Sequence, residues 1–186
     1  MRRKTLDLLL NWIGVLLTVM LLAAAAGLMV GYSFTTNQVK TQLAEEKVYF
    51  PTKTQSDYAD LVAANKTQLA GKQVLTGSDA QTFANDIIQV DTDHISGGLT
   101  YSQISAKAMA DPSNTQLANQ VELVFRGDTL RGLLLNAYAF GTFGVIALYS
   151  AIAAFVLALF MLLLTLLGVR HYKQVHPEET VGESSI

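Results

Sequence analysis

Two stretches without a charged residue decide the fold of this chain. They are LLLNWIGVLLTVMLLAAAAGLMVGYSFTTNQV at residues 8–39 and GLLLNAYAFGTFGVIALYSAIAAFVLALFMLLLTLLGV at residues 132–169. A helix needs about 20 apolar residues to cross the hydrocarbon core of a bilayer, which is about 30 Å thick. Each stretch exceeds that length, so the sequence predicts two transmembrane helices with a polar segment between them.

The composition limits what else the chain can be. Its 186 residues leave room for one small domain besides the spans, and the hydrophobic share of 51% comes mainly from them. The net charge of −2, without a clustered basic face, argues against nucleic-acid binding. The absence of cysteine excludes disulfides, thiolate metal sites and a cysteine nucleophile.

The positions of the basic residues predict the topology. Cytoplasmic ends of transmembrane helices carry an excess of Lys and Arg. We therefore expect both termini in the cytoplasm and the middle of the chain outside the plasma membrane. The apolar run is too long for a signal peptide, so an uncleaved anchor is expected, although cleavage at the small residues 23–26 stays open. The flanking basic residues are Arg2, Arg3, Lys4, Arg170 and Lys173.

Length sets the boundaries of the second span. One helix over 132–169 would be about 57 Å long, nearly twice the membrane core. Its first part is therefore expected at the outer interface. The predicted segments are a cytoplasmic N-terminus (1–7), the first span (8–32), an extracytoplasmic domain with membrane-proximal stalks (33–131), an interfacial start of the second helix (132–141), the second span (142–169) and a cytoplasmic tail (170–186).

The polar middle segment has the periodicity of helices. Apolar residues from Ala80 to Ile95 recur at three- and four-residue spacing, between a cap at Thr76 or Ser78 and a stop at Gly97. Two further helices are expected, capped by Thr100 and Ser113, the latter with a bend near Gly127, and a weak helix is expected near Tyr58. The predicted fold class is all-α: a two-transmembrane-helix hairpin with a small helical extracytoplasmic cap domain.

Small residues recur in both spans at spacings that favour helix packing. In lipid, small residues let helix backbones approach, and van der Waals contact is the main attraction. The pattern predicts either a tight hairpin within the chain or docking on a partner, with Gly14 outside the first-span pattern. The helix-packing candidates are Ala23, Gly27, Gly31, Ala147, Ala151, Ala154 and Ala158.

Amphipathic side chains mark the expected membrane interfaces. Trp and Tyr gather at headgroup depth, and Arg can anchor there as well. Arg131 fits the charge rule least well, because it would lie at the outer end of the second span. The interfacial anchors expected from the sequence are Trp12, Tyr32, Arg131, Tyr138 and Tyr172.

The chain offers little that points to catalysis. No Asp, Glu, Lys, Arg or His lies within either span, which argues against a pump or coupled transporter. Asp91, Asp93 and His94 look like metal ligands, but His94 is explained equally by the preference for cations at a helix C-terminus. Glu122 and Arg126 are spaced as a helix ion pair. We expect no catalytic residue, no metal and no cofactor.

Four segments carry a resemblance to known proteins: Tyr49-Phe50-Pro51, Leu75-Thr76-Gly77, residues 95–101 and most specifically residues 125–138, although Asp128 stands where Glu is expected. They resemble a family of small actinobacterial membrane proteins with two spans around a short outer domain. Members are often labelled aromatic ring-opening dioxygenases. That chemistry needs non-haem iron, usually on two His and a carboxylate. The expected topology places His94 outside the membrane and His171 and His176 inside, so the three histidines cannot form one site. The resemblance implies the topology and a plasma-membrane location, and no reaction.

The function expected from these observations is non-catalytic. We expect an accessory, stabilising or assembly subunit that docks on an integral membrane partner in a larger complex, respiratory or transport, with membrane lipids around it. The first alternative is an extracytoplasmic sensor or ligand-binding module, against which the short cytoplasmic ends speak. The second is a homo-oligomeric membrane protein, and the third is an enzyme.

Overall fold

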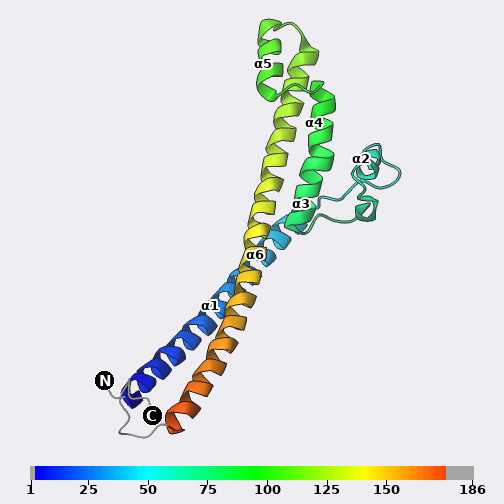
Figure 1. The fold of residues 1–186 in the computed structure, drawn as a ribbon. Helices are drawn as coiled ribbons and strands as arrows, with labels where there is room; N and C mark the ends of the chain where they lie inside the picture. The colour runs from blue at the N-terminus through cyan, green and yellow to red at the C-terminus, as the bar shows by residue number, and fades with distance from the viewer. Residues whose placement is uncertain (1–2, 175–186) are drawn as a thin grey trace. The chain divides into compact units, whose positions relative to one another are not determined.

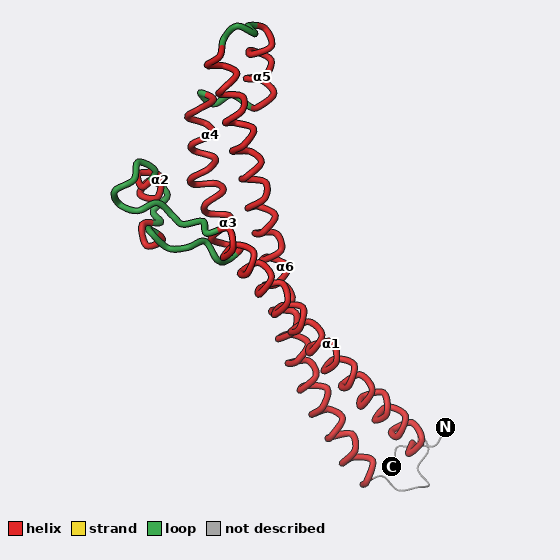
Figure 2. The backbone as a smooth tube through the Cα atoms, turned by 180° about the vertical axis from the view of Figure 1, so that it is seen from behind, coloured by secondary structure: helices red, strands yellow, loops and turns green. Residues whose placement is uncertain are grey.

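The computed structural model describes residues 3–174, and no strand occurs among them. The all-α prediction is confirmed. Figure 2 shows helices joined by loops throughout this part of the chain. The chain divides into two compact units. The cap unit is Phe34–Gly144, and the hairpin unit consists of the described residues on either side of it.

Two long helices, α1 (Arg3–Glu46) and α6 (Thr115–Gln174), contain the two uncharged stretches. Both are long and apolar enough to cross a membrane, as predicted. Only 17% and 11% of the most apolar windows are buried in the molecule, so these are not the buried core helices of a soluble protein. The tail beyond residue 174 and Arg2 lie outside the described residues.

In the hairpin unit, α1 and α6 pack through small residues spaced by four or seven positions. A seven-residue spacing is typical of left-handed helix pairs, which are common among transmembrane helices. On α1 the buried positions are Gly14, Thr18 and Ala25, and on α6 they are Ala151, Ala158 and Thr165. The two threonine hydroxyls donate to the carbonyl oxygens of Gly14 and Met161 at 2.8 Å, so neither is unsatisfied.

The cap unit contains the remaining helices (Figure 1). They are α2 (Tyr58–Ala63), the 3₁₀ helix η1 (Thr67–Leu69), α3 (Gly77–Phe83), the π-helix η2 (Ala84–Ile88), α4 (Gln89–Ser96) and α5 (Tyr101–Ala110). The segments α3, η2 and α4 follow one another without a break, so the helix predicted around residues 80–95 exists but contains a π turn.

The predicted helix ends are mostly confirmed. Thr76 and Asp79 form a capping box at the start of α3, Thr100 and Gln103 form one at α5, and Gly97 ends α4 in the left-handed conformation. The cap at Ser113 was wrong. The side chain of Asn114 accepts from the Leu117 amide at 3.1 Å instead, because it stands one residue before α6, where an N-cap is needed.

Gly127, where a bend is expected, does not interrupt α6, which runs through it as one helix. Gly127 serves another purpose, since a Cβ there would lie 2.5 Å from Oγ1 of Thr92. The missing side chain therefore lets α4 lie close against α6. A similar approach joins the start of α3 to α6, where a Cβ on Gly141 would lie 3.0 Å from the Cα of Gly77.

The core of the cap unit joins both long helices to the polar middle segment. Phe83 packs edge-on against the buried Phe50, with ring centroids 5.5 Å apart. Helix α1 ends where Lys47 takes a positive φ of 52°, and the chain returns through a single antiparallel bridge between Tyr49 and Gln73. The buried cluster comprises Val39, Leu43, Phe50, Leu61, Val74, Ala80 and Ile87.

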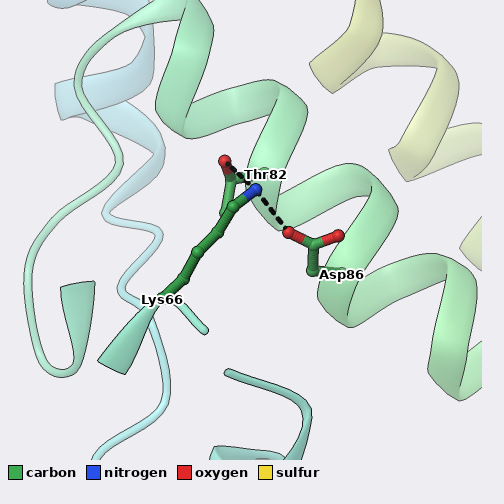
Figure 3. Close-up of polar contacts among 3 residues, drawn as sticks. All are labelled: Lys66, Thr82 and Asp86. Atoms are coloured by element: carbon green, nitrogen blue, oxygen red, sulfur yellow. Dashed lines mark hydrogen bonds and ion pairs between the residues drawn. The ribbon is translucent and has the colours of Figure 1, made fainter. Parts of the chain in front are cut away.

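A partly buried polar contact attaches the irregular segment 52–75 to this core (Figure 3). The Lys66 ammonium donates to Oδ2 of Asp86 at 2.7 Å and to Oγ1 of Thr82 at 3.1 Å. Lys66 reaches them because Asn65, in the left-handed conformation with φ of 55°, turns the chain after α2. The contact ties the loop after α2 to α3 and η2.

Candidate functional site

A groove of about 800 Å³ lies within the cap unit, between the C-terminal part of α1 and the first half of α6. Phe83 of α3 and Ile88 of η2 form the third side of the groove. This volume is within the range of about 300–1,000 Å³ that is usual for small-molecule sites. Its lining is mainly apolar, and the long helices contribute Phe34, Val39, Leu43, Leu130, Leu133, Leu134, Ala137 and Phe140.

The groove has two chemically different ends. Gly144 of α6 approaches Thr35 of α1, and Phe34 and Phe140 line the end of the groove near this contact. At the other end α1 contributes Glu45 and Glu46, both exposed. No salt bridge to either carboxylate occurs among the described residues. The groove therefore runs from an aromatic end to an acidic end.

Gln38, Gln42 and Asn136 add amide groups along the groove between its two ends. All three side chains are exposed, so their amides can hydrogen-bond to water or to a ligand. The polar groups lie on the rim, while Val39 and Leu43 are buried in the core below it. An apolar floor with a polar rim suits a ligand that has both kinds of surface.

Helix η2 holds the wall of the groove in place. Arg131 of α6 donates to Oδ1 of Asn85 at 3.1 Å, and its Nε is buried without a partner. Three residues of the π turn η2 have different partners. Asn85 contacts α6, Asp86 contacts Lys66, and Ile88 lines the groove. A π turn is frequent at functional sites because it re-aims successive side chains.

The predicted interfacial anchors fall into two groups. Trp12 is 68% exposed, whereas Tyr32, Tyr138 and Tyr172 are half-buried. Arg131 is half-buried as well and bonds to Asn85, so it has a place inside the cap unit besides any role at an interface. This contact explains why a basic residue stands at a position that fits the charge rule poorly.

The two small-residue patterns have different surroundings. Ala147, Ala151, Ala154 and Ala158 of α6 lie on the face that packs against α1. Ala23 and Gly27 are exposed, and a Cβ on Gly27 would meet nothing within 4 Å.

For Ala23 and Gly27, the prediction that the small residues of the first span pack against the second span is therefore wrong. Gly31 is half-buried, and a Cβ there would likewise meet nothing within 4 Å. The reason is register: two residues turn a helix by about 200°, so Gly27 points away when Ala25 points inward. Gly14, expected outside the pattern, is the close-contact glycine, because a Cβ there would lie 2.5 Å from Oγ1 of Thr165.

The remaining charged candidates lie on α4 and α6. Asp91, Asp93 and His94 belong to α4, and the described residues include no group of three metal-ligating side chains. Asp93 accepts from Gln89 at 2.9 Å. Burial raises the pKa of Asp91, the carboxylates of Asp57 and Asp60 raise it further, and His94 lowers it.

The ion pair predicted between Glu122 and Arg126 is present on α6. Both side chains are largely exposed, so the pair contributes little to stability. It therefore marks a solvated helix face and adds nothing to the groove.

Comparison of the chain with protein-family models, with curated proteins and with solved structures finds no match. The groove and the exposed face of α1 are therefore the two features of the molecule that indicate a function.

Proposed function

We propose that this chain is a non-catalytic integral membrane protein of the plasma membrane that docks on a larger membrane complex as an accessory or assembly subunit. The observation that carries the proposal is the exposed position of Ala23 and Gly27. They lie in the most apolar part of α1, on the face opposite the contact with α6. The hairpin contact uses its own small residues and leaves this face open.

Physical chemistry favours a helix as the partner of that face. Within lipid, hydrophobic burial does not drive helices together, so close packing at small residues is the main source of affinity. Gly27 has space for a neighbouring backbone, since among the described residues no atom outside its own stretch of helix lies within 4 Å of its Cβ position. A transmembrane helix of another protein fits this surface better than a bulky lipid chain does.

A pull-down in gentle detergent, read by mass spectrometry, tests the proposal. The wild type is expected to retain a stoichiometric membrane partner, and Gly27→Ile is expected to lose it because the branched side chain prevents close approach. Ala26→Ile is the matched control, since Ala26 is also exposed but lies on another face. Equal retention by both variants, or a wild type that purifies alone, would overturn the proposal.

A second candidate function, an extracytoplasmic ligand-binding module, is favoured by one specific observation. The groove of about 800 Å³ is larger than a packing defect, and its floor and rim differ in chemistry. The two functions are compatible, because the groove belongs to the cap unit and the Gly27 face to the hairpin unit.

A further inference from the structure

We propose that the groove of the cap unit holds one hydrocarbon chain of a membrane amphiphile whose head group carries an ammonium. The inference goes beyond docking on a partner complex, and it rests on the proposal that the chain is inserted in a membrane. Its four supports are the length of the groove, the chemistry of its floor, the charge at one end and the sequence that forms the other end.

The length of the groove suits a linear ligand. Its α1 side extends from Phe34 to Glu46, which is about 18 Å at a rise of 1.5 Å per residue. A compact polar metabolite would leave most of that length empty. An extended alkyl chain can lie along it and cover apolar side chains from end to end.

The exposed apolar side chains that line the groove are covered by such a ligand. Leu133 and Phe140 of α6 are 64% and 52% exposed, and Phe34 of α1 is 68% exposed. Covering apolar surface is favourable when the alternative is water. Large apolar side chains concentrated on both sides of one groove indicate an apolar occupant.

The head group follows from charge complementarity. Glu45 and Glu46 stand at the end of the groove away from Phe34, and neither forms a salt bridge within the described part of the chain. Gln42 lies one turn before Glu46 on the same helix and offers an amide beside them. Two carboxylates favour an ammonium and disfavour a phosphate or carboxylate that lacks a cation.

The residues at the opposite end of the groove indicate where the ligand comes from. Phe34, Val39, Ala137 and Phe140 belong to the two uncharged stretches, and residues 132–141 are those expected at the outer membrane interface. A groove formed by such residues is accessible to lipid more readily than to a dissolved metabolite. We therefore assign the occupant to the membrane.

Photolabelling of the purified full chain in phosphatidylglycerol bilayer discs tests the assignment. The probe is hexadecylamine with a diazirine near the end of its chain, and the comparison probe is the matched hexadecanol. Labelled peptides are identified by mass spectrometry. Since no partner protein is present, failure of the docking proposal does not affect this result.

Three variants make the test specific. Asn136→Trp fills the groove from an exposed lining position, and Ala139→Trp is its control because Ala139 is exposed on α6 but does not line the groove. The double variant Glu45→Gln, Glu46→Gln removes the charge and keeps the shape. Circular dichroism checks that all variants remain helical.

The expected result is labelling by hexadecylamine of peptides that contain Phe34 or Phe140. Asn136→Trp should lose it and Ala139→Trp should keep it. The double variant should reduce amine labelling to the level of the alcohol, a change of roughly threefold for partly exposed charges. Equal labelling in both tryptophan variants, or equal labelling by both probes in the wild type, would overturn the proposal.

Discussion

At the scale of single residues, the absence of a side chain decides how close the two long helices come. Gly14 has Thr165 directly opposite, and Gly168 lies similarly against the Asn11 side chain. Gly27, in the same α1 helix, has open space at its Cβ position. Glycines that look alike in the sequence therefore have different roles.

Replacing Gly14 should destabilise the isolated protein. In Gly14→Ile the new side chain would overlap Thr165, and overpacking of this kind costs about 1–3 kcal/mol. Gly27→Ile is the control and should leave the melting temperature in detergent nearly unchanged. A larger loss of stability for Gly27→Ile than for Gly14→Ile would contradict the packing described for the hairpin unit.

The carboxyl group of Asp91 gives a pH-dependent prediction. Burial, with Asp57 and Asp60 nearby, raises its pKa in the folded protein, so the folded state binds this proton more tightly than the unfolded chain does. Ionised Asp91 therefore opposes folding at neutral pH, and this effect is relieved as the pH falls through the raised pKa toward the ordinary value of 3.8.

We expect Asp91→Asn to raise the melting temperature at pH 7, with an advantage that shrinks as the pH approaches 4. Thermal unfolding followed by circular dichroism measures it. Asp93→Asn is the control, because Asp93 is exposed and accepts a hydrogen bond from Gln89. If the advantage of Asp91→Asn in melting temperature grew toward low pH, the pKa of Asp91 would be lowered in the folded protein, contrary to the prediction.

At the scale of elements, α6 combines regions with different surroundings. Its first half is part of the cap unit, where Gly141 touches the first turn of α3, and its second half belongs to the hairpin unit. Gly132 lies in the same helix with nothing within 4 Å of its Cβ position. The two glycines therefore allow a comparison within one element.

Alanine at these positions should change stability in opposite directions. Gly132→Ala should stabilise α6 by about 0.5–1 kcal/mol, because alanine loses less conformational entropy in a helix. Gly141→Ala should destabilise the protein, since its Cβ would press against the backbone of Gly77 at 3.0 Å. The melting temperatures of the two variants test this prediction. Stabilisation by both substitutions would show that α3 does not pack against Gly141 of α6 as described.

At the scale of the whole molecule, periodicity and capping patterns predict much of the fold. The charge-free stretches predict the long helices, and Thr76, Gly97 and Thr100 predict helix ends, because these signals are local. The contact between Arg131 and Asn85 joins residues far apart in the sequence, so no local pattern predicts it.

The face of α1 used by the hairpin was missed for a related reason. Several small-residue patterns exist in one Ala- and Gly-rich helix, and only the partner helix selects among them. The groove was missed because its lining comes from α1, α6 and the segment around η2, and each contributes only a few residues. The sequence signal that could have pointed to it is the mixture of Phe34, Gln38, Gln42 and Glu45 on one side of α1.

The central claim is that two helices cross the plasma membrane and that the cap unit lies outside. The chain lacks cysteine, so single cysteines at Ser56, in the cap unit, and at Gln174, at the end of α6, can be compared directly. In intact cells a membrane-impermeant thiol reagent should label Ser56→Cys and should label Gln174→Cys only after the membrane is opened. Labelling of Gln174→Cys alone in intact cells, or of neither before the membrane is opened, would contradict the account.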